Sequence, residues 1–294
     1  MIEFHADDYG LFPEQSRRIL RCREQGVLNA VSIFPNSPDL QRCLEQLDPV
    51  ARELRLTIHL NLMEGKSLCP PEELPLLVDG EGVFTVSFAS LLLAPLTGKY
   101  GQYRQQLKRE LSAQIHALLP YLQAQGAPLR LDGHAHWHVV PVVFDALMDV
   151  IREEKLPVEY IRMPAEPVGL FFRHLPALFP FHPINIVKTA LLRILCRRNR
   201  RRHRQALAAM KQSLFLGVLF SGNFGYAKFR ALLPDARRLA EKKGWDLELL
   251  AHPGAVYEPE DVEKLTNRDD VHFLTSPCRD EEGRALRRLK EDRE

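Results

Sequence analysis

Short β-type runs alternate with longer runs of helical period along most of the chain, and this alternation constrains the fold more than any other feature. Strands that are separated by helices pair in parallel, because each crossover helix returns the chain to the same end of the sheet. The pattern predicts an α/β fold, either a (β/α) barrel or a doubly wound sheet. No linker or internal repeat interrupts it, so we expect a single domain over residues 1–294. The expected strands cover 2–6, 28–34, 54–60, 129–132, 158–163, 213–219, 247–252 and 271–275, and the expected helices cover 16–25, 38–53, 102–125, 141–155 and 227–243, followed by a charged tail.

The composition excludes several classes of protein. Forty Lys and Arg residues against 38 Asp and Glu residues give a net charge of +2, which argues against a dedicated nucleic-acid binder. With 45% hydrophobic residues the chain has enough apolar content to avoid disorder. No apolar run approaches the roughly 20 residues that cross a bilayer. The first residues also lack the basic and apolar regions of a signal peptide, so we expect a cytoplasmic protein.

The cysteines limit the kind of metal site that the chain can form. They are widely spaced and never form a Cys-x-x-Cys motif, which predicts reduced thiols rather than disulfides or a thiolate zinc site. Any bound metal would therefore need nitrogen and oxygen ligands. The five cysteines are Cys22, Cys43, Cys69, Cys196 and Cys278.

One segment, residues 165–211, departs from the alternation. Its first part is apolar and contains prolines, and the part from 184 to 211 is strongly basic. Apolar residues at helical spacing, such as Val187, Leu191 and Ile194, predict an amphipathic basic helix inserted between two strands. Two interpretations stay open: a solvated helical excursion, or a lid or docking surface for anionic partners or membrane headgroups. The arginines are Arg193, Arg197, Arg198, Arg200, Arg201, Arg202 and Arg204.

Polar residues suited to catalysis or metal binding follow several of the expected strands. Because the carboxyl ends of parallel strands meet at one face of the sheet, we expect these residues to converge on one mouth. Asp7 and Asp8 follow the first strand, His59 lies in the third, Asp132 to His138 follow the fourth, Arg162 to Glu166 follow the fifth, and His252 ends the strand at 247–252.

Three histidines at alternate positions form the most informative cluster. His134, His136 and His138 would share one face if the backbone there were extended. Three desolvated imidazoles without partners are costly, which favours metal binding or catalysis over a structural role.

The other clusters are ambiguous when each is taken alone. Asp7 and Asp8 before Tyr-Gly are compatible with a turn or a helix cap, His59 with a core histidine, and His252 with a turn that ends a strand. Together, imidazoles and a carboxylate suit a divalent ion that acidifies water and polarises a carbonyl, as amide or ester hydrolysis requires. Adjacent Asp7 and Asp8 would point to opposite sides of an extended strand. We therefore expect one to be a ligand and the other to accept a proton from water.

Five segments carry a resemblance to a known family. They are Ala6-Asp7-Asp8-Tyr9-Gly10, Ile58 to Gly65, Asp132-Gly133-His134-Ala135-His136-Trp137-His138 with Pro141, Arg162-Met163-Pro164-Ala165-Glu166, and His252-Pro253-Gly254. In this order the segments resemble the YdjC/ChbG-like carbohydrate deacetylase family, including its hopanoid-biosynthesis-associated branch. Any one segment alone would be weak support, but five in order are specific.

The resemblance implies an irregular, TIM-like (β/α) barrel of the glycoside hydrolase/deacetylase type. It implies a hydrolase that uses one divalent metal ion, Mg or Zn, to remove acetyl from an N-acetylated sugar, and at family level a homodimer. The metal ligands would be Asp8, His59 and His134, the general base Asp7 and the general acid His252. The residues expected to bind substrate or support the site are Arg162, Glu166, His136, His138 and Glu64.

The chain departs from the family pattern at a few positions. Members often have Asn where this chain has His5, which adds another nitrogen near the site, and often Ser where it has Gly133. Two other functions remain open. An amidohydrolase or phosphoesterase barrel would pair His134 with His136 on two metals, although the aspartate pair on the first strand counts against it. A non-catalytic sugar- or lipid-binding barrel would keep the same cavity.

Overall fold

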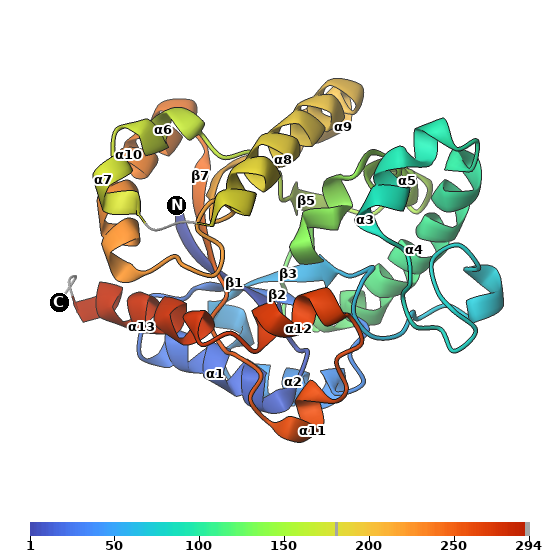
Figure 1. Ribbon diagram of the computed structural model, residues 1–294, viewed down its shortest axis with the longest axis horizontal. Coiled ribbons are helices and arrows are strands. Elements are labelled where there is room, and N and C mark those ends of the chain that lie inside the picture. Colours follow the sequence, from blue (N-terminus) through green and yellow to red (C-terminus); the bar gives the residue numbers. More distant parts are fainter. Residues whose placement is uncertain (180–181, 292–294) are drawn as a thin grey trace.

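The structure, a computed structural model, describes residues 1–179 and 182–291. Its strands form one parallel sheet in the order β5-β4-β3-β2-β1-β7-β6, with helices packed around it (Figure 1). The predicted α/β class with a parallel sheet is thus confirmed. The strands are β1 (Ile2–Tyr9), β2 (Ala30–Ile33), β3 (Arg55–Leu60), β4 (Leu129–Gly133), β5 (Val158–Ile161), β6 (Ser213–Leu216) and β7 (Asp246–Ala251).

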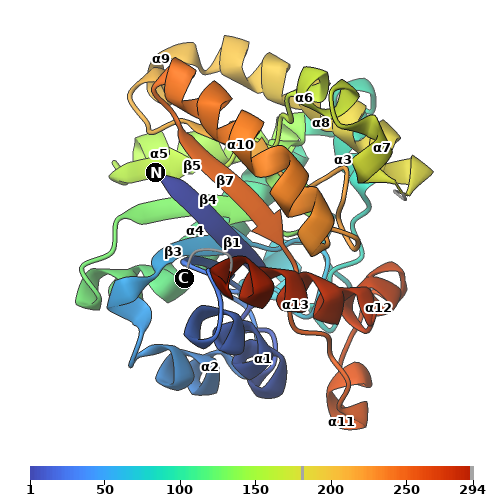
Figure 2. The same cartoon turned by 90° about the vertical axis from the view of Figure 1, so that its left-hand side faces the viewer.

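Helices cover the sheet on its outer side, and Figure 2 shows α10 lying alongside β7 with α13 crossing below it. The helices are α1 (Pro13–Glu24), α2 (Leu40–Leu47), α3 (Phe88–Leu93), α4 (Tyr100–Ala124), α5 (Pro141–Glu153), α6 (Val168–Phe172), α7 (Leu175–Leu178), α8 (Pro183–Arg202), α9 (Arg204–Ala208), α10 (Tyr226–Lys243), α11 (Pro259–Val262), α12 (Arg268–Leu274) and α13 (Cys278–Glu291). Short 3₁₀ helices are η1 (Ala51–Glu53), η2 (Pro71–Glu73), η3 (Ala94–Leu96) and η4 (His134–Val139).

The central strand β1 pairs with β2 on one side and β7 on the other. Strands in such a position are covered on both faces and are usually continuous apolar runs. β1 instead carries His5, Asp7 and Asp8, all buried. Ionisable groups in the middle of a sheet need partners inside the protein, so β1 organises the interior polar contacts.

The sheet does not close into a complete barrel. Among the described residues no ladder joins the edge strands β5 and β6. One backbone hydrogen bond lies between these edges, from the Lys211 amide just before β6 to the Glu159 carbonyl of β5, at 2.9 Å. Buried side chains span the opening instead: Glu248 on β7 accepts hydrogen bonds from Tyr160 and from Arg162. The expectation of a TIM-like barrel is therefore met only as a parallel half-barrel.

The strand expected at 271–275 is wrong, because those residues belong to α12 and the turn after it. A short apolar run has the same appearance in a buried strand and in a helix, and here a long-range contact favours the helix. The Glu64 carboxylate accepts the backbone N–H groups of Thr266 and Asn267 immediately before the helix. The expected charged tail is also a helix, α13, which packs on α1 and α10.

The segment 165–211 contains α6 to α9, and Figure 1 shows α8 and α9 end to end along the upper side of the molecule. Asp145, a fully buried residue of α5, holds this pair of helices. Its carboxylate accepts two hydrogen bonds from Arg198, at 2.8 and 2.9 Å, and lies 3.1 Å from Arg202 and 2.7 Å from His203. Within the described residues, no helix is both long and apolar enough to cross a membrane.

We predict that Asp145→Ala lowers the free energy of unfolding by about 1.5–3 kcal/mol, because it removes a buried carboxylate that accepts charge-assisted hydrogen bonds from the partly exposed side chains of α8 and α9. Glu153→Ala on the same helix is the control: its partner Lys108 is at the surface, and such pairs contribute at most about 1 kcal/mol. Denaturant unfolding of both variants measures the difference. Equal losses would contradict the anchoring role of Asp145.

Candidate active site

A cavity of about 470 Å³ opens at the carboxyl ends of the strands. Five of the residues that the sequence singles out line it: Asp7, Asp8, His134, His136 and His252. They come from three segments that are far apart in the sequence, so the expected convergence on one mouth occurs. The remaining wall is largely apolar and comes in part from α8.

Asp7 and Asp8 diverge at the end of β1. The register of β1 against β2 shifts between Ala6 and Tyr9, and Asp8 has a φ of 68°, so a bulge rather than plain extended backbone separates the two carboxylates. Arg162 Nη1 donates to both Asp7 oxygens, at 2.9 and 2.8 Å. Arg279 Nη2 donates to Asp8 Oδ2 at 2.9 Å. The two aspartates therefore have separate partners, as two different roles would require.

Asp8, His59 and His134 form a cluster whose ligand atoms all lie within 4.8 Å of one another. His134 Nδ1 is 3.0 Å and His59 Nε2 is 3.4 Å from Asp8 Oδ1. His59 Nε2 is buried but has no hydrogen-bond partner. Because such an atom is costly unless it meets a cation or a donor, this donor set fits a divalent metal ion.

Carboxylates hold the far sides of both imidazoles. His59 Nδ1 lies 2.7 Å from Asp132 Oδ1, and His134 Nε2 lies 2.6 Å from Asp270 Oδ2. Partners of this kind fix the ring orientation of metal-binding histidines. Burial alone would lower the pKa of His59, but Asp7 and Asp132 raise it to about 9. Burial would raise the pKa of Asp8, yet Arg279 and the two histidines hold it well below its usual range.

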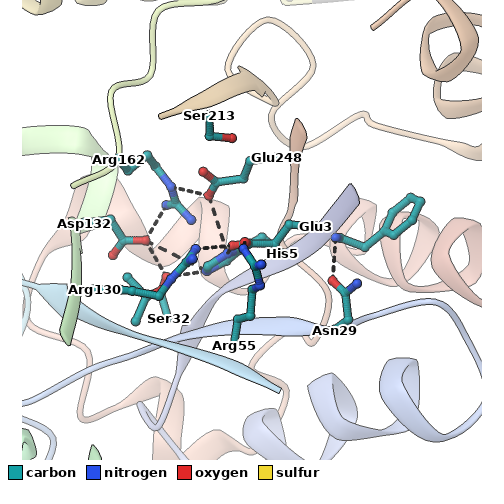
Figure 3. Close-up of polar contacts among 12 residues, drawn as sticks. Glu3, His5, Asn29, Ser32, Arg55, Arg130, Asp132, Arg162, Ser213 and Glu248 are labelled. Atoms are coloured by element: carbon teal, nitrogen blue, oxygen red, sulfur yellow. Dashed lines mark hydrogen bonds and ion pairs between the residues drawn. The ribbon is translucent and has the colours of Figure 1, made fainter. Parts of the chain in front are cut away.

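Beneath the cavity lies a network of buried ions, shown in Figure 3. Arg162 pairs with Asp132 at 2.8 Å and with Glu248 at 2.7 Å, in addition to Asp7. Both ring nitrogens of His5 are taken, by Glu3 at 2.7 Å and by Ser32 at 2.6 Å. The extra nitrogen that His5 brings to this chain therefore lies within the network and is not free to face the cavity.

The three alternate histidines do not share a face. They lie in η4, where Ala135 and His136 have φ values of 47° and 63°, so the expected extended backbone is wrong. His134 joins the Asp8 cluster and His136 lines the cavity, whereas His138 Nε2 lies 2.8 Å from the Arg162 carbonyl. Burial lowers the pKa of His138 to about 4. A Cβ on Gly133 would lie 2.8 Å from His138 Nδ1, so glycine at 133 lets the His138 ring pack directly against the end of β4.

His252 on the opposite wall depends on α13. Glu282 Oε2 accepts the His252 backbone N–H at 2.6 Å and lies 3.5 Å from its Nδ1. Glu282 Oε1 accepts the Phe224 N–H at 3.0 Å. The carboxylate thus fixes the position of His252 and faces its ring.

The profile of the family described as YdjC-like protein matches residues 1–282. The chain belongs to the YdjC-like family. This confirms the resemblance that the five sequence segments carry.

Curated relatives of this YdjC-like chain are carbohydrate deacetylases. That of Thermoanaerobacter pseudethanolicus is 27% identical over 165 residues, covering 56% of this chain and 61% of the relative. That of Mus musculus is 28% identical over 166 residues, covering 55% and 49%. The matched part thus spans about half to three-fifths of these relatives. A putative cellobiose-phosphate cleavage protein from Enterococcus faecalis V583 has the same fold, with a TM-score of 0.63 at 17% identity, covering 99% of this chain and 92% of that structure.

Two carboxylates that the sequence assigns to the YdjC-like site do not line the cavity. Glu166 is fully buried and accepts three backbone N–H groups, the first from Gly217 at 2.7 Å, after β6. Glu64 holds the residues before α12. Both therefore support the walls of the cavity rather than reach into it.

Sequence reasoning missed Asp270, Arg279 and Glu282, which contact His134, Asp8 and His252 respectively. Asp270 lies just before the strand expected at 271–275, and Arg279 and Glu282 lie in the expected charged tail. The available signal was the spacing of Ala285, Leu286 and Leu289, which is typical of a helix with one buried face.

We predict that His134→Ala weakens Zn²⁺ binding by at least about a hundredfold, because it removes one of three ligands. Asp132→Asn, which loses the charge that orients His59, weakens it by about 10–100-fold. Isothermal titration of the metal-stripped protein measures both. His116→Ala, an exposed histidine on α4, should bind like the parent protein. Unchanged affinity in His134→Ala would remove His134 from the ligand set.

Proposed function

We propose that this chain is a metal-dependent hydrolase that removes acetyl from an N-acetylated sugar or oligosaccharide. One observation carries the proposal: a cluster of one carboxylate and two imidazoles lies at a single cavity, which a second carboxylate and a separate histidine also line. Amide hydrolysis needs an electrophilic catalyst, a base for water and an acid for the leaving amine. The names of the curated relatives support the substrate class. Because the site draws on residues 7 to 282, we also propose that the chain acts as one domain.

Asp8, His59 and His134 would hold the metal. When bound, a divalent ion supplies Lewis acidity, which polarises the acetamide carbonyl and lowers the pKa of water. One carboxylate with two imidazoles suits zinc, and magnesium is the alternative that we expect for the same set.

Asp7 would accept the proton from the attacking water. Its carboxylate lines the cavity, and Arg162 Nη1 contacts both of its oxygens, so the side chain has one orientation. The guanidinium also balances the charge that Asp7 shares with Asp132 and Glu248. A base held in this way costs little reorganisation when water enters.

His252 would donate a proton to the departing amine nitrogen. It faces the cavity, and the buried Glu282 holds it on the side away from solvent. An acid catalyst must be held within hydrogen-bond reach of the leaving nitrogen, and Glu282 holds the backbone of His252 in place beside the cavity. His136 completes the wall, whereas Arg162, Glu166, His138 and Glu64 would act through the groups they position.

The alternative with two metals on a His134 and His136 pair lacks support in the geometry. Among the described residues, the metal-type clusters that include His134 do not include His136. Burial lowers the pKa of His136, and Arg162 and the neighbouring histidines lower it further. Within the described residues its buried Nδ1 has no hydrogen-bond partner. We therefore propose a single metal ion.

We predict that Asp7→Asn lowers kcat by at least about a hundredfold while Zn²⁺ affinity stays within a few fold, because the base is lost and the ligands are kept. Acetate released from N-acetylated chitooligosaccharides measures turnover, with a chelator-treated sample that should be inactive. Glu81→Gln, a change to an exposed loop carboxylate, is the control. Full activity in Asp7→Asn would exclude Asp7 as the base, and acetate release from none of the sugars would point to a different acyl substrate or to a non-catalytic barrel.

Glu282→Gln tests the acid side of the cavity separately. We predict that kcat falls by about 10–100-fold with little change in KM, because His252 loses the carboxylate that holds its backbone and faces its ring. Zn²⁺ affinity should be unaltered, since Glu282 contacts His252 and not the metal cluster. A variant with the parent kcat would show that Glu282 serves packing alone.

A further inference from the structure

The segment 165–211 exposes an unusual share of apolar side chains. Of the twelve large hydrophobic residues that are exposed among the described residues, seven lie in this segment. Single exposed apolar residues are ordinary, but a concentration on one segment marks a surface that binds something. The seven are Phe172, Leu175, Phe179, Ile184, Ile186, Val187 and Ile194.

Three of these residues form a stripe on the outer side of α8. Ile184, Val187 and Ile194 are 58%, 61% and 65% exposed, and their spacing places them on the same side of the helix. The opposite side of α8 is buried, where Asn185 bonds to the Leu219 carbonyl and Asn199 to the Val139 carbonyl. The polar contacts of α8 thus hold one face inward and leave the stripe exposed on the other, where Ile184 and Val187 border the mouth of the cavity and Ile194 lies beyond it.

The arginines of α8 and α9 divide into two groups. Four are held by the protein: Arg198 and Arg202 by Asp145, Arg193 by the Glu166 carbonyl, and Arg200 over the Trp245 ring. The other three, Arg197, Arg201 and Arg204, are exposed and contact no carboxylate within the described residues.

The unpaired cations adjoin the apolar stripe. Arg197 and Arg201 are one helical turn apart, and a shallow depression on this face is lined by Ile194, Arg197 and Arg201 together with the two arginines paired to Asp145. This face of α8 therefore carries exposed aliphatic side chains first and then the unpaired guanidinium groups of Arg197 and Arg201. Helices with these properties lie in the plane of a membrane interface.

We propose that this face of α8 docks on an anionic phospholipid surface, with the aliphatic stripe entering the headgroup region and Arg197, Arg201 and Arg204 contacting lipid phosphates. Charge complementarity favours this occupant over a neutral apolar partner, because the three free cations need anions. The stripe favours a bilayer over a nucleic acid, whose phosphates would leave the aliphatic side chains in water.

Docking in this way would also orient the cavity. Two residues of the stripe, Ile184 and Val187, also line the cavity of the candidate active site, together with Leu191 of the same helix. The mouth of the cavity would therefore open beside the lipid surface. The membrane interaction itself does not depend on the proposed hydrolase activity and is measured independently of it.

Cosedimentation of the full chain with vesicles tests the proposal. We expect at least about tenfold tighter binding to phosphatidylcholine vesicles that contain phosphatidylglycerol than to phosphatidylcholine alone, and weaker binding as salt is raised. The triple variant R197E/R201E/R204E should lose the preference for anionic vesicles. Ile194→Asn should weaken binding without altering the charge.

A charge-matched triple variant at exposed positions elsewhere, R52E/R230E/K242E, is the control and should keep most of the binding. Thermal unfolding of every variant shows that each is folded. Absence of binding to anionic vesicles at low salt would overturn the proposal, and so would an equal loss in the control. Binding to a duplex oligonucleotide but not to vesicles would overturn it in favour of a nucleic-acid partner.

Discussion

The buried guanidinium of Arg162 holds together three carboxylates that would otherwise repel one another. Asp7 on β1, Asp132 on β4 and Glu248 on β7 all lie within 2.9 Å of it. Removing one member of a buried ion cluster leaves charge without compensation, which costs about 3–5 kcal/mol. Because the contacts cross the interior of the sheet where the β5 and β6 edges do not form a ladder, the same side chain stabilises the half-barrel and positions its polar centre.

The candidate active site is connected to this network through Asp132. That carboxylate contacts Arg162 on one side and His59 Nδ1 on the other, so the network fixes the ring of a proposed metal ligand. The C-terminal helices contribute in the same way from above, where Asp270 contacts His134 and Arg279 contacts Asp8. Charged groups from both ends of the chain thus orient the ligand set, and the YdjC-like chain has its cavity only when α12 and α13 are packed.

The arginines of the inserted segment fall into groups that the sequence does not separate. Those paired with Asp145 attach α8 and α9 to the body of the protein, whereas Arg197, Arg201 and Arg204 contact no carboxylate within the described residues. Basicity in the sequence does not distinguish the two groups, because pairing depends on a carboxylate on α5 about 50 positions earlier in the chain. The structure separates them and thereby defines the surface to which we assign lipid binding.

Much of the protein follows from the sequence alone, because periodicity and local motifs are short-range properties. The alternation of elements predicts the parallel sheet, and the residues that follow the strands predict a single site with Asp7 and Asp8 in different roles. Tertiary structure decided the rest. A short apolar run at 271–274 is ambiguous until Glu64 binds the residues before it, and His134, His136 and His138 separate because the backbone after Gly133 bends to fit His138. Arg279 and Glu282 enter the site from a helix that no local pattern connects to Asp8 or His252, since contacts across more than two hundred residues, such as that of Arg279 with Asp8, depend on packing.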